Sequence, residues 1–512
     1  MCRENTQTIP IEGLEDFGRK DRLPVSFGEA HALTAAMADD TVYRVTLAAR
    51  TVEADYCCAT LEDRMQPAGA PARSADPPST WQPESGKLRA GYALAVLFAI
   101  NLLNFYDRQT LGPLAEPIRK EFHLTDTQLG LLGTVFTILY AVVGLPFGRL
   151  ADSWSRKKLL ALGMLVWSAL TAGAALVTSF GMLVVTRLGV GVGEATCAPA
   201  GTSWIGDLFP AHKRSRALAF FMLAVPMGTA LSYMVSGPVA QAFGWRAALL
   251  LAAFPAVLLT PALITLREPR RGGSESHVSA GHHVSAWSLV RIPTLWWITA
   301  SGALINFNLY ALGTFLPAFV TRVHGLSIAR SAFWLGVGHA AAGIFAVLAG
   351  GLIGDYAIRR RRNGRMLSAS VTALAAAPLA LLSVMQPAGS WVAAIVLMCA
   401  AYGLLNTYYG LVYSALQDIV APALRGTAMS IYFMAMYLCG ASFGPLLTGR
   451  LSDLMARRAT ESGAITEAAR ATGLQQAMFV IPALSVGLAL VLYAGSRTVA
   501  RDMAARDRQL EP

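Results

Sequence analysis

The sequence has few charged residues for its length. Only 14% of its 512 residues are Asp, Glu, Lys or Arg, whereas 54% are hydrophobic. In a typical soluble domain roughly a quarter of the residues are charged. The scarcity of charge therefore argues against a soluble enzyme or binding domain, and the composition is typical of a membrane protein.

Cysteine is also scarce, and its six copies form no framework. Cys2, Cys57 and Cys58 precede the hydrophobic region, and the other three fall inside hydrophobic runs. No disulfide framework or metal-ligand spacing follows, so we predict no metal and no cofactor. Histidines 277, 282 and 283 lie in a polar loop, where solvated side chains are expected and metal binding is the alternative.

Long apolar runs are absent before residue 88, so no secretory signal is predicted there. The part from Gln66 to Lys87 is rich in Pro, Ala and Ser, which predicts a disordered extension over residues 1–87. Within it, Tyr43–Ala49 has the character of a short strand. Met65 is a candidate for the natural start, with the preceding residues coming from an overlong reading frame.

Apolar runs of about 20 residues follow, each long enough to cross a hydrocarbon core of roughly 30 Å. They predict an all-α integral membrane protein with twelve transmembrane helices. The domains expected are a six-helix N-terminal half at 88–266, a linker at 267–293, a six-helix C-terminal half at 294–496 and a tail at 497–512. The predicted spans are 90–112, 127–147, 159–178, 181–205, 216–240, 245–266, 294–320, 331–354, 366–385, 389–416, 427–449 and 474–495.

The net charge of +11 comes from basic residues that cluster in alternate loops, after spans two, four and eight. This distribution follows the positive-inside rule and argues against a nucleic-acid binder. It predicts a multi-pass protein of the cell (inner) membrane with cytoplasmic N- and C-termini. The loop after span eleven disagrees, because Arg450, Arg457, Arg458 and Arg470 fall on the outer side and are only partly offset by Asp453, Glu461 and Glu467.

One cluster occurs twice with the same spacing: a glycine, an acid four residues later, and a basic triplet beginning four after the acid. Duplication of this kind points to transport. Two further patterns repeat in the same order. Asp207 is followed seven residues later by Arg214, as Asp418 is by Arg425, and Gly237-Pro238 recurs as Gly444-Pro445. We interpret the cluster as a cytoplasmic gate that latches the halves in one conformation, with a simple topology anchor as the alternative. The gate residues are Gly148, Asp152, Arg156, Lys157, Gly351, Asp355, Arg359 and Arg360.

Four charged residues lie well inside predicted spans, where each costs at least ~2.5 kcal/mol near the bilayer centre. Asp107 and Arg108 are in span one, and Arg187 and Glu194 are in span four. The last two share a helix face but are roughly 10.5 Å apart along it, so each should face a cavity or a partner such as Asp107. A static ion-pair network is the alternative to a functional site. Gly189, Gly191 and Gly193 have no side chains, so they predict a thin helix that a neighbour can approach. Their spacing is not that of a nucleotide-binding loop, which excludes that interpretation.

The stretch Gly148-Arg-Leu-Ala-Asp152-Ser-Trp-Ser-Arg156-Lys157-Lys158 resembles the signature loop of the major facilitator superfamily, with serine departing from the pattern at 153 and 155. Asn104-Phe-Tyr-Asp107-Arg108, with Arg187 and Gly191-Val-Gly193-Glu194-Ala195, resembles the spinster branch. The resemblance implies two rocking six-helix halves, a lipid-like substrate and proton coupling. It makes Asp107 and Glu194 candidates for protonation, and Arg108 and Arg187 their charge partners or ligands of a substrate anion.

The C-terminal half is polar without being charged in its spans. Amides, phenols and an imidazole there are candidates to line a cavity for an amphiphile, although packing with one hydrogen bond is the alternative. The cavity candidates, including one residue of span one, are Asn104, Asn306, Asn308, His339, Asn406 and Tyr409.

The function expected is therefore proton-coupled transport of a lysophospholipid- or sphingolipid-like substrate by a monomer in the bilayer. A small organic anion is the alternative substrate. A membrane receptor is the alternative class, and an enzyme is not expected, because no nucleophile with a base or metal set occurs in the spans.

Overall fold

The computed structural model describes residues 32–36, 44–48, 85–269, 286–421, 424–460 and 465–510. The chain divides into two units, Met1–Gln82 and Pro83–Pro512. The predicted linker histidines and the candidate start at Met65 lie outside the described residues.

In the first unit, β1 (Ala32–Ala36) pairs antiparallel with β2 (Arg44–Ala48), with Ala32 opposite Ala48. The second strand falls inside the run Tyr43–Ala49. The disordered extension expected over residues 1–87 includes these two segments, and it stays a prediction. Val45 and Thr46 are β-branched, and such residues favour extended backbone.

In the second unit, the N-terminal half runs from residue 85 to residue 265, and four of its six spans are interrupted. These spans are α2 (Ser85–Gln109) with α3 (Leu111–Phe122), α4 (Asp126–Ser153), α5 (Arg156–Ala174), α6 (Phe180–Glu194) with α7 (Cys197–Leu208), α8 (Ala211–Met222) with α9 (Ala224–Phe243), and α10 (Trp245–Ala253) with α11 (Pro255–Thr265).

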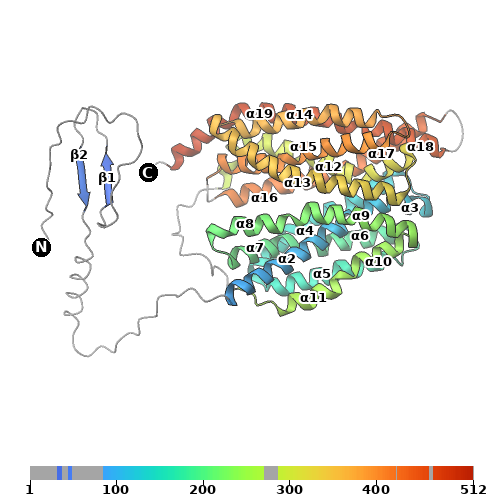
Figure 1. The fold of residues 1–512 in the computed structure, drawn as a ribbon, viewed down its shortest axis with the longest axis horizontal. Coiled ribbons are helices and arrows are strands. Elements are labelled where there is room, and N and C mark those ends of the chain that lie inside the picture. Colours follow the sequence, from blue (N-terminus) through green and yellow to red (C-terminus); the bar gives the residue numbers. More distant parts are fainter. Residues whose placement is uncertain are drawn as a thin grey trace. The chain divides into compact units, whose positions relative to one another are not determined.

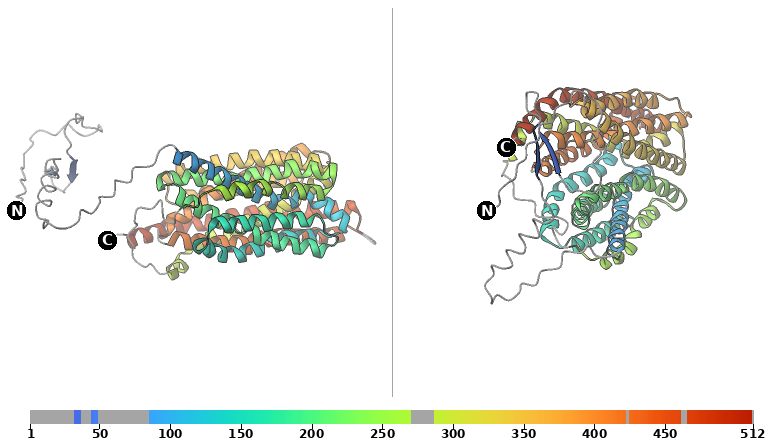
Figure 2. Two further views of the ribbon diagram at one scale, coloured as in Figure 1. Left: turned by 90° about the horizontal axis from the view of Figure 1, so that it is seen from below. Right: turned by 60° about the vertical axis from the view of Figure 1, so that its left-hand side comes forward.

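The C-terminal half has longer continuous helices, and it lies on the other side of the bundle in Figures 1 and 2. After η1 (Ala286–Arg291) it comprises α12 (Pro293–His324), α13 (Ile328–Arg360), α14 (Gly364–Val384), α15 (Trp391–Ile419), α16 (Arg425–Ala435) with η3 (Met436–Ala441) and α17 (Phe443–Arg458), and α18 (Glu467–Met478) with α19 (Val480–Leu510).

Eleven helical segments among the described residues are long and apolar enough to span a membrane. The twelfth span is α5, which has 19 residues but begins with Arg156, Lys157 and Lys158. These charges lower its mean hydropathy. The predicted all-α architecture of twelve membrane helices is thus confirmed.

Local signals set where several helices begin and end. Thr125 and Gln128 form a capping box at the start of α4, and Ser155 caps α5 by accepting from the amide of Lys158. Gly244 and Gly325 follow α9 and α12 with φ of 86° and 71°. Glycine adopts such values without steric cost, so the chain turns there into the next span.

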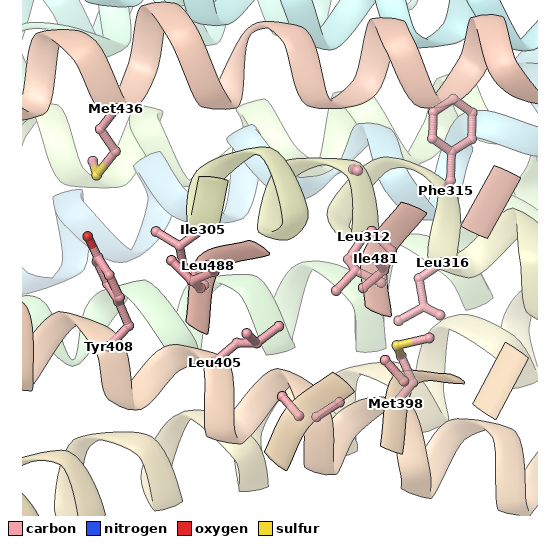
Figure 3. Packing of buried hydrophobic residues seen from close by; sticks show 14 of the residues in the cluster. Ile305, Leu312, Phe315, Leu316, Met398, Leu405, Tyr408, Met436, Ile481 and Leu488 are labelled. Carbon is pink, nitrogen blue, oxygen red and sulfur yellow. The ribbon is translucent and has the colours of Figure 1, made fainter. Parts of the chain in front are cut away.

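Two hydrophobic cores hold the bundle together. One lies within the N-terminal half and includes Trp167 and Trp204. The other fills the C-terminal half, where Leu312, Met398 and Ile481 from three helices meet (Figure 3). This second core continues into α3 and the first turns of α4. The halves are therefore joined by shared apolar packing at one end.

Glycines allow the halves to approach closely where α4 meets α17 and α9 meets α13. A Cβ on Gly130 would lie 2.3 Å from the carbonyl oxygen of Pro445, and one on Gly237 would lie 2.2 Å from Ala332. The repeated Gly-Pro pairs of spans five and eleven thus lie at contacts between the halves. Any side chain at Gly130 must push α4 and α17 apart.

We predict that Gly130→Ala destabilises the protein by roughly 1–3 kcal/mol, the usual cost of overpacking. Gly144→Ala is the matched control, since Gly144 lies on the same helix and a Cβ added there would meet nothing within 4 Å. The control should unfold at the same temperature as the parent or slightly above it, because alanine favours helix. Thermal unfolding in detergent measures both, and equal midpoints for the two variants would contradict the prediction.

Candidate transport site

Four buried ionisable residues meet in the core of the N-terminal half. Asp107, Arg187 and Glu194 are at most 3% exposed, and the side chain of Arg108 is 3% exposed. Arg108 Nε donates to Glu194 Oε2 at 3.1 Å, and Arg108 Nη2 donates to Asn104 Oδ1 at 3.3 Å. Asn104 Nδ2 in turn donates to the backbone oxygen of Glu194 at 3.4 Å. Helices α2 and α6 are thus joined by one charged hydrogen-bond network.

Asp107 and Arg187 are less well satisfied. Within the described part of the chain, both carboxylate oxygens of Asp107 and two guanidinium nitrogens of Arg187 are buried without a hydrogen-bond partner. The charges of Asp107, Arg187 and Glu194 nevertheless interact electrostatically. The structure therefore gives Glu194 an ion-pair partner in Arg108, one of the two arginines that the resemblance made candidate charge partners. A buried ion without a partner costs free energy. A change of charge or of contacts in this cluster would remove that cost.

The local fold of α6 places Glu194 at a break. Helix α6 ends at Glu194, and α7 begins at Cys197 after Thr196, whose hydroxyl donates to the oxygen of Gly193 at 2.8 Å. A Cβ on Gly191 would meet the Phe136 oxygen at 2.8 Å, and one on Gly193 would meet Gly163 at the same distance. The glycine run therefore lets α4 and α5 press against α6 beside the charges, as a thin helix predicts.

Aromatic rings connect Arg108 to the C-terminal half. Its guanidinium lies 4.3 Å from the ring centre of Tyr140 and 4.8 Å from that of Phe105. The Tyr140 ring is 5.3 Å from Tyr437, which packs on Tyr310 at 6.3 Å. Sequence reasoning missed Tyr140, although its spacing of four from Phe136 places both rings on one face of α4.

The polar candidates of the C-terminal half separate into two groups. Tyr409 donates to Asn306 Oδ1 at 3.4 Å, and Asn406 donates to the oxygen of Tyr402 at 2.7 Å. His339 packs between Tyr402 and Tyr233, with ring centres 4.5 and 5.0 Å away, and Nδ1 lies 2.7 Å from the Leu335 oxygen. His339 thus contacts the N-terminal half through Tyr233 of α9.

Asn308 differs from the other candidates. It is fully buried, and its amide donates to Ser485 of α19 at 3.2 Å. It therefore packs inside the C-terminal half, against α19, and its role as a cavity residue stays a prediction. Its position two residues after Asn306 on α12 turns it to the opposite side of the helix.

A small cavity between the halves brings the two candidate anion ligands together. Arg108 and Arg187 both line it, with Thr137 from α4 and Tyr310 and Thr314 from α12. Two guanidinium groups beside hydroxyl groups form a site suited to a carboxylate or phosphate.

At one end of the bundle, which we call the sealed end, ion pairs cross between the halves. Arg322 of α12 donates to Glu116 at 2.7 Å and, through two nitrogens, to both oxygens of Asp126 at 2.9 Å. The side chains of all three are at most 5% exposed. A bidentate pair in so little water is strong and directional.

Two further contacts complete the sealed end. Arg119 donates to Glu467 of α18 at 2.7 Å, where α3 and α18 lie together in Figure 1. Asp453 of α17 accepts from the backbone amides of Asp126 and Thr127 at 3.0 and 2.8 Å. These amides are the unsatisfied first donors of α4, so a carboxylate from the other half caps that helix. Asp453 and Glu467 belong to the loop region whose charge disagreed with the positive-inside count.

At the opposite end, which we call the basic end, the repeated cluster makes contacts within each half. Arg156 is 1% exposed and pairs with Asp207 and, at 3.1 Å, with Glu268. Lys157 Nζ donates to the oxygens of Ile264 and Leu266 at 3.1 and 2.9 Å. Gly148 has open space around it, and the side chain of Asp152 lies outside what the structure describes. This cluster therefore ties together the ends of α5, α7 and α11.

The second copy uses a different arginine. Arg365 pairs with Asp418 and lies 3.9 Å from Asp355, whereas Arg359 and Arg360 are exposed and Gly351 has open space around it. The reason is helix length: α4 ends one residue after Asp152, but α13 continues five residues beyond Asp355. The role of Arg156 at the start of the next helix therefore falls to Arg365, and the position-by-position match of the basic triplets does not extend to their contacts.

Comparison with known proteins gives consistent similarities. Residues 97–445 match the family described as the Major Facilitator Superfamily. Similar curated proteins include an MFS-type efflux pump of Mycolicibacterium smegmatis, 29% identical over 72% of this chain and 86% of that protein. Protein spinster homolog 1 of Homo sapiens is 32% identical over 72% of this chain and 74% of its own length. The sphingosine-1-phosphate transporter of Xenopus tropicalis is 27% identical over 79% and 82%, respectively.

A solved structure is similar as well. It is the crystal structure of a bacterial homolog to the human lysosomal transporter spinster, in an inward-facing and unoccupied conformation. It aligns with a TM-score of 0.73 at 27% identity, covering 81% of this chain and 98% of that one.

We predict that Arg322→Gln weakens the sealed end, because it leaves Glu116 and Asp126 as buried charges without their shared partner. Loss of one member of a buried ion pair costs roughly 3–5 kcal/mol. A cysteine at Ser452, which is fully buried beside Asp126, should then react faster with a water-soluble maleimide.

Arg330→Gln is the matched control, since Arg330 is an exposed arginine at the start of α13 near the same end. It should leave the labelling rate unchanged. Equal rates in the two variants would show that Arg322 does not hold this end shut.

We also predict a pH dependence from Glu268, which lies beyond the last residue of α11. Partial burial raises its pKa, but hydrogen bonds from Ser155, Arg156 and Lys157 outweigh burial and bring the pKa below the usual 4.5. Its stabilising contribution is therefore present above pH 4.5 and is lost as the pH falls through the lowered value. Glu268→Gln should lower the melting temperature at pH 7, and the difference from the parent should shrink as the pH falls below 4.5 and through the lowered pKa. A constant difference across this range would argue against the assignment.

Proposed function

Because the chain belongs to the major facilitator superfamily and is a spinster-like multi-pass membrane transporter, we propose that it moves a lipid-like or amphipathic substrate by alternating access coupled to protons. The observation that carries the proposal is the central cluster. Arg108, at a cavity lined by both halves, forms an ion pair with Glu194, and beside this pair Asp107 and Arg187 carry buried polar atoms that have no hydrogen-bond partner among the described residues.

The arrangement of the two ends supports alternating access. Ion pairs and a shared core join the halves at the sealed end, whereas Arg156 and Arg365 pair within their own halves at the basic end. By the positive-inside rule the basic end is cytoplasmic, as are both termini, in a cell (inner) membrane. The conformation is then inward-facing, as in the related bacterial structure. The open surroundings of Gly148 and Gly351 suit a latch that engages when this end closes.

Proton coupling is supported by the chemistry of the buried carboxylates. Glu194 is fully buried, so either Arg108 or a proton is needed to offset the hydration that its charge has lost. If Arg108 turns toward a substrate anion, the carboxylate of Glu194 gains a proton. Asp107, which has no hydrogen-bond partner among the described residues, offers a second position for protonation.

A lipid-like substrate is favoured over a small organic anion by the surroundings of the arginines. Arg108 is enclosed by Phe105, Phe136 and Tyr140, so an anionic group bound there has apolar rings beside it. The relative from Xenopus tropicalis transports sphingosine 1-phosphate, which combines a phosphate with a long chain. A small organic anion remains the second candidate, because the same two arginines would bind it. A receptor would have no use for a gate at each end.

We predict that Asp107→Asn and Glu194→Gln each abolish proton-driven transport in proteoliposomes while leaving expression and size-exclusion profiles unchanged. A panel of lysophospholipids, sphingoid phosphates and small organic anions, tested with and without a pH gradient, gives the measurement. Glu121→Gln is the control, since its side chain is 41% exposed on α3. Normal gradient-driven transport by both central variants would overturn the coupling, and uptake of small anions alone would overturn the lipid-like substrate.

A further inference from the structure

The outer surface of the N-terminal half has an apolar groove that the transport cycle does not use. Its volume is about 410 Å³. Phe98, Leu102 and Tyr106 of α2 form its floor, with Leu231 of α9 on one side and Leu251 and Leu258 of α10 and α11 on the other. The lining is almost entirely hydrocarbon.

The packing of three helices explains why the groove exists. Helix α9 is held against α2 at two points: a Cβ on Gly228 would lie 2.6 Å from the Leu102 oxygen, and Tyr106 shares a hydrogen bond of 3.1 Å with Ser236. Helix α10 packs on α9, whereas α11 packs on α2. The span changes neighbours at Pro255, which lines the groove and cannot donate a helical hydrogen bond. The space is left at this crossover.

The depth of the groove determines what occupies it. Its residues lie in the middle of the spans Arg89–Phe122, Arg216–Phe243 and Trp245–Thr265. Leu231, Leu251 and Leu258 are 43%, 42% and 65% exposed, so the groove opens outward between α9 and the sixth span. At this depth the surrounding medium is bilayer hydrocarbon, and a polar partner would leave its groups unsatisfied.

We propose that the groove binds one acyl chain of a bilayer phospholipid. If a methylene takes roughly the 30 Å³ that a water molecule has in the liquid, the groove accommodates a chain of about a dozen carbons. The chain lies against Tyr106, whose neighbour Asp107 belongs to the central cluster. A bound chain therefore fills the space behind the part of α2 that carries Asp107 and Arg108, and it supports the contact of α2 with α9 and α11.

The test is photolabelling of the full-length protein in liposomes that contain phosphatidylcholine with a diazirine in one acyl chain. Peptide mapping should find labels several-fold enriched on Leu102, Leu251 and Leu258 over Val185 and Val257, which are 65% and 63% exposed but do not line the groove. Labelling needs no gradient and no substrate. Its outcome is therefore independent of the proposed coupling, and Glu194→Gln should label like the parent.

Filling variants make the assignment specific. Ala99→Phe and Leu251→Trp, tested separately, should each lower groove labelling several-fold, whereas Leu250→Trp should not, since Leu250 is 50% exposed and lies outside the groove. Size-exclusion profiles identify any variant that misfolds. If one filling variant misfolds, the labelling of the other tests whether the groove is the binding site. Even labelling over the whole lipid-facing surface, undiminished labelling in a folded filling variant, or labelling by a photoreactive lysophospholipid but not by phosphatidylcholine would each overturn the proposal.

Discussion

A charge buried in hydrocarbon needs a partner, and this constraint organises the whole bundle. The structure meets it in three ways along its length. At the sealed end Arg322 is shared between Glu116 and Asp126 of the other half. At the basic end Arg156 is satisfied by Asp207 and Glu268 of its own half. In the centre, pairing is incomplete. Ion pairs that cross between the halves hold them together, and ion pairs within one half leave the halves free to move. The incompletely paired charges in the centre are the ones that can change their protonation or their partner.

The elements that could be predicted are those encoded by neighbouring residues. Apolar run length predicts the spans, and residue pattern placed Asp107, Arg108, Arg187 and Glu194 in two of them. The sealed end could not be predicted, because its paired charges lie near helix ends that are 196 to 348 residues apart in the sequence. Until the halves are docked, they look like ordinary loop charges. The sequence also could not show that Arg365, and not Arg359, pairs with Asp418. Only the length of α13 reveals which arginine lies at the start of the next helix.

Duplication has left the halves alike at the basic end and unlike in the interior. In the N-terminal half α6 breaks at Glu194, beside glycines that draw in α4 and α5. The corresponding span of the C-terminal half, α15, runs unbroken from Trp391 to Ile419 and presents tyrosines. One half thus carries charge on helices that are interrupted, and the other offers a continuous wall of phenols. Arg108 lies between them, with Glu194 on one side and the rings of Tyr140 and Tyr437 on the other.

In the proposed cycle, this difference decides where coupling can occur. The charges of the sealed end lie near helix ends, so separating the halves admits water, and hydration replaces the lost ion pairs without any change of protonation. The central charges differ, because they lie at mid-depth, where Asp107, Arg187 and Glu194 are at most 3% exposed in this conformation. In the cycle that we propose, Arg108 leaves Glu194 and a proton neutralises the carboxylate where it lies. We therefore propose that the gates open by hydration and that the centre changes state by titration.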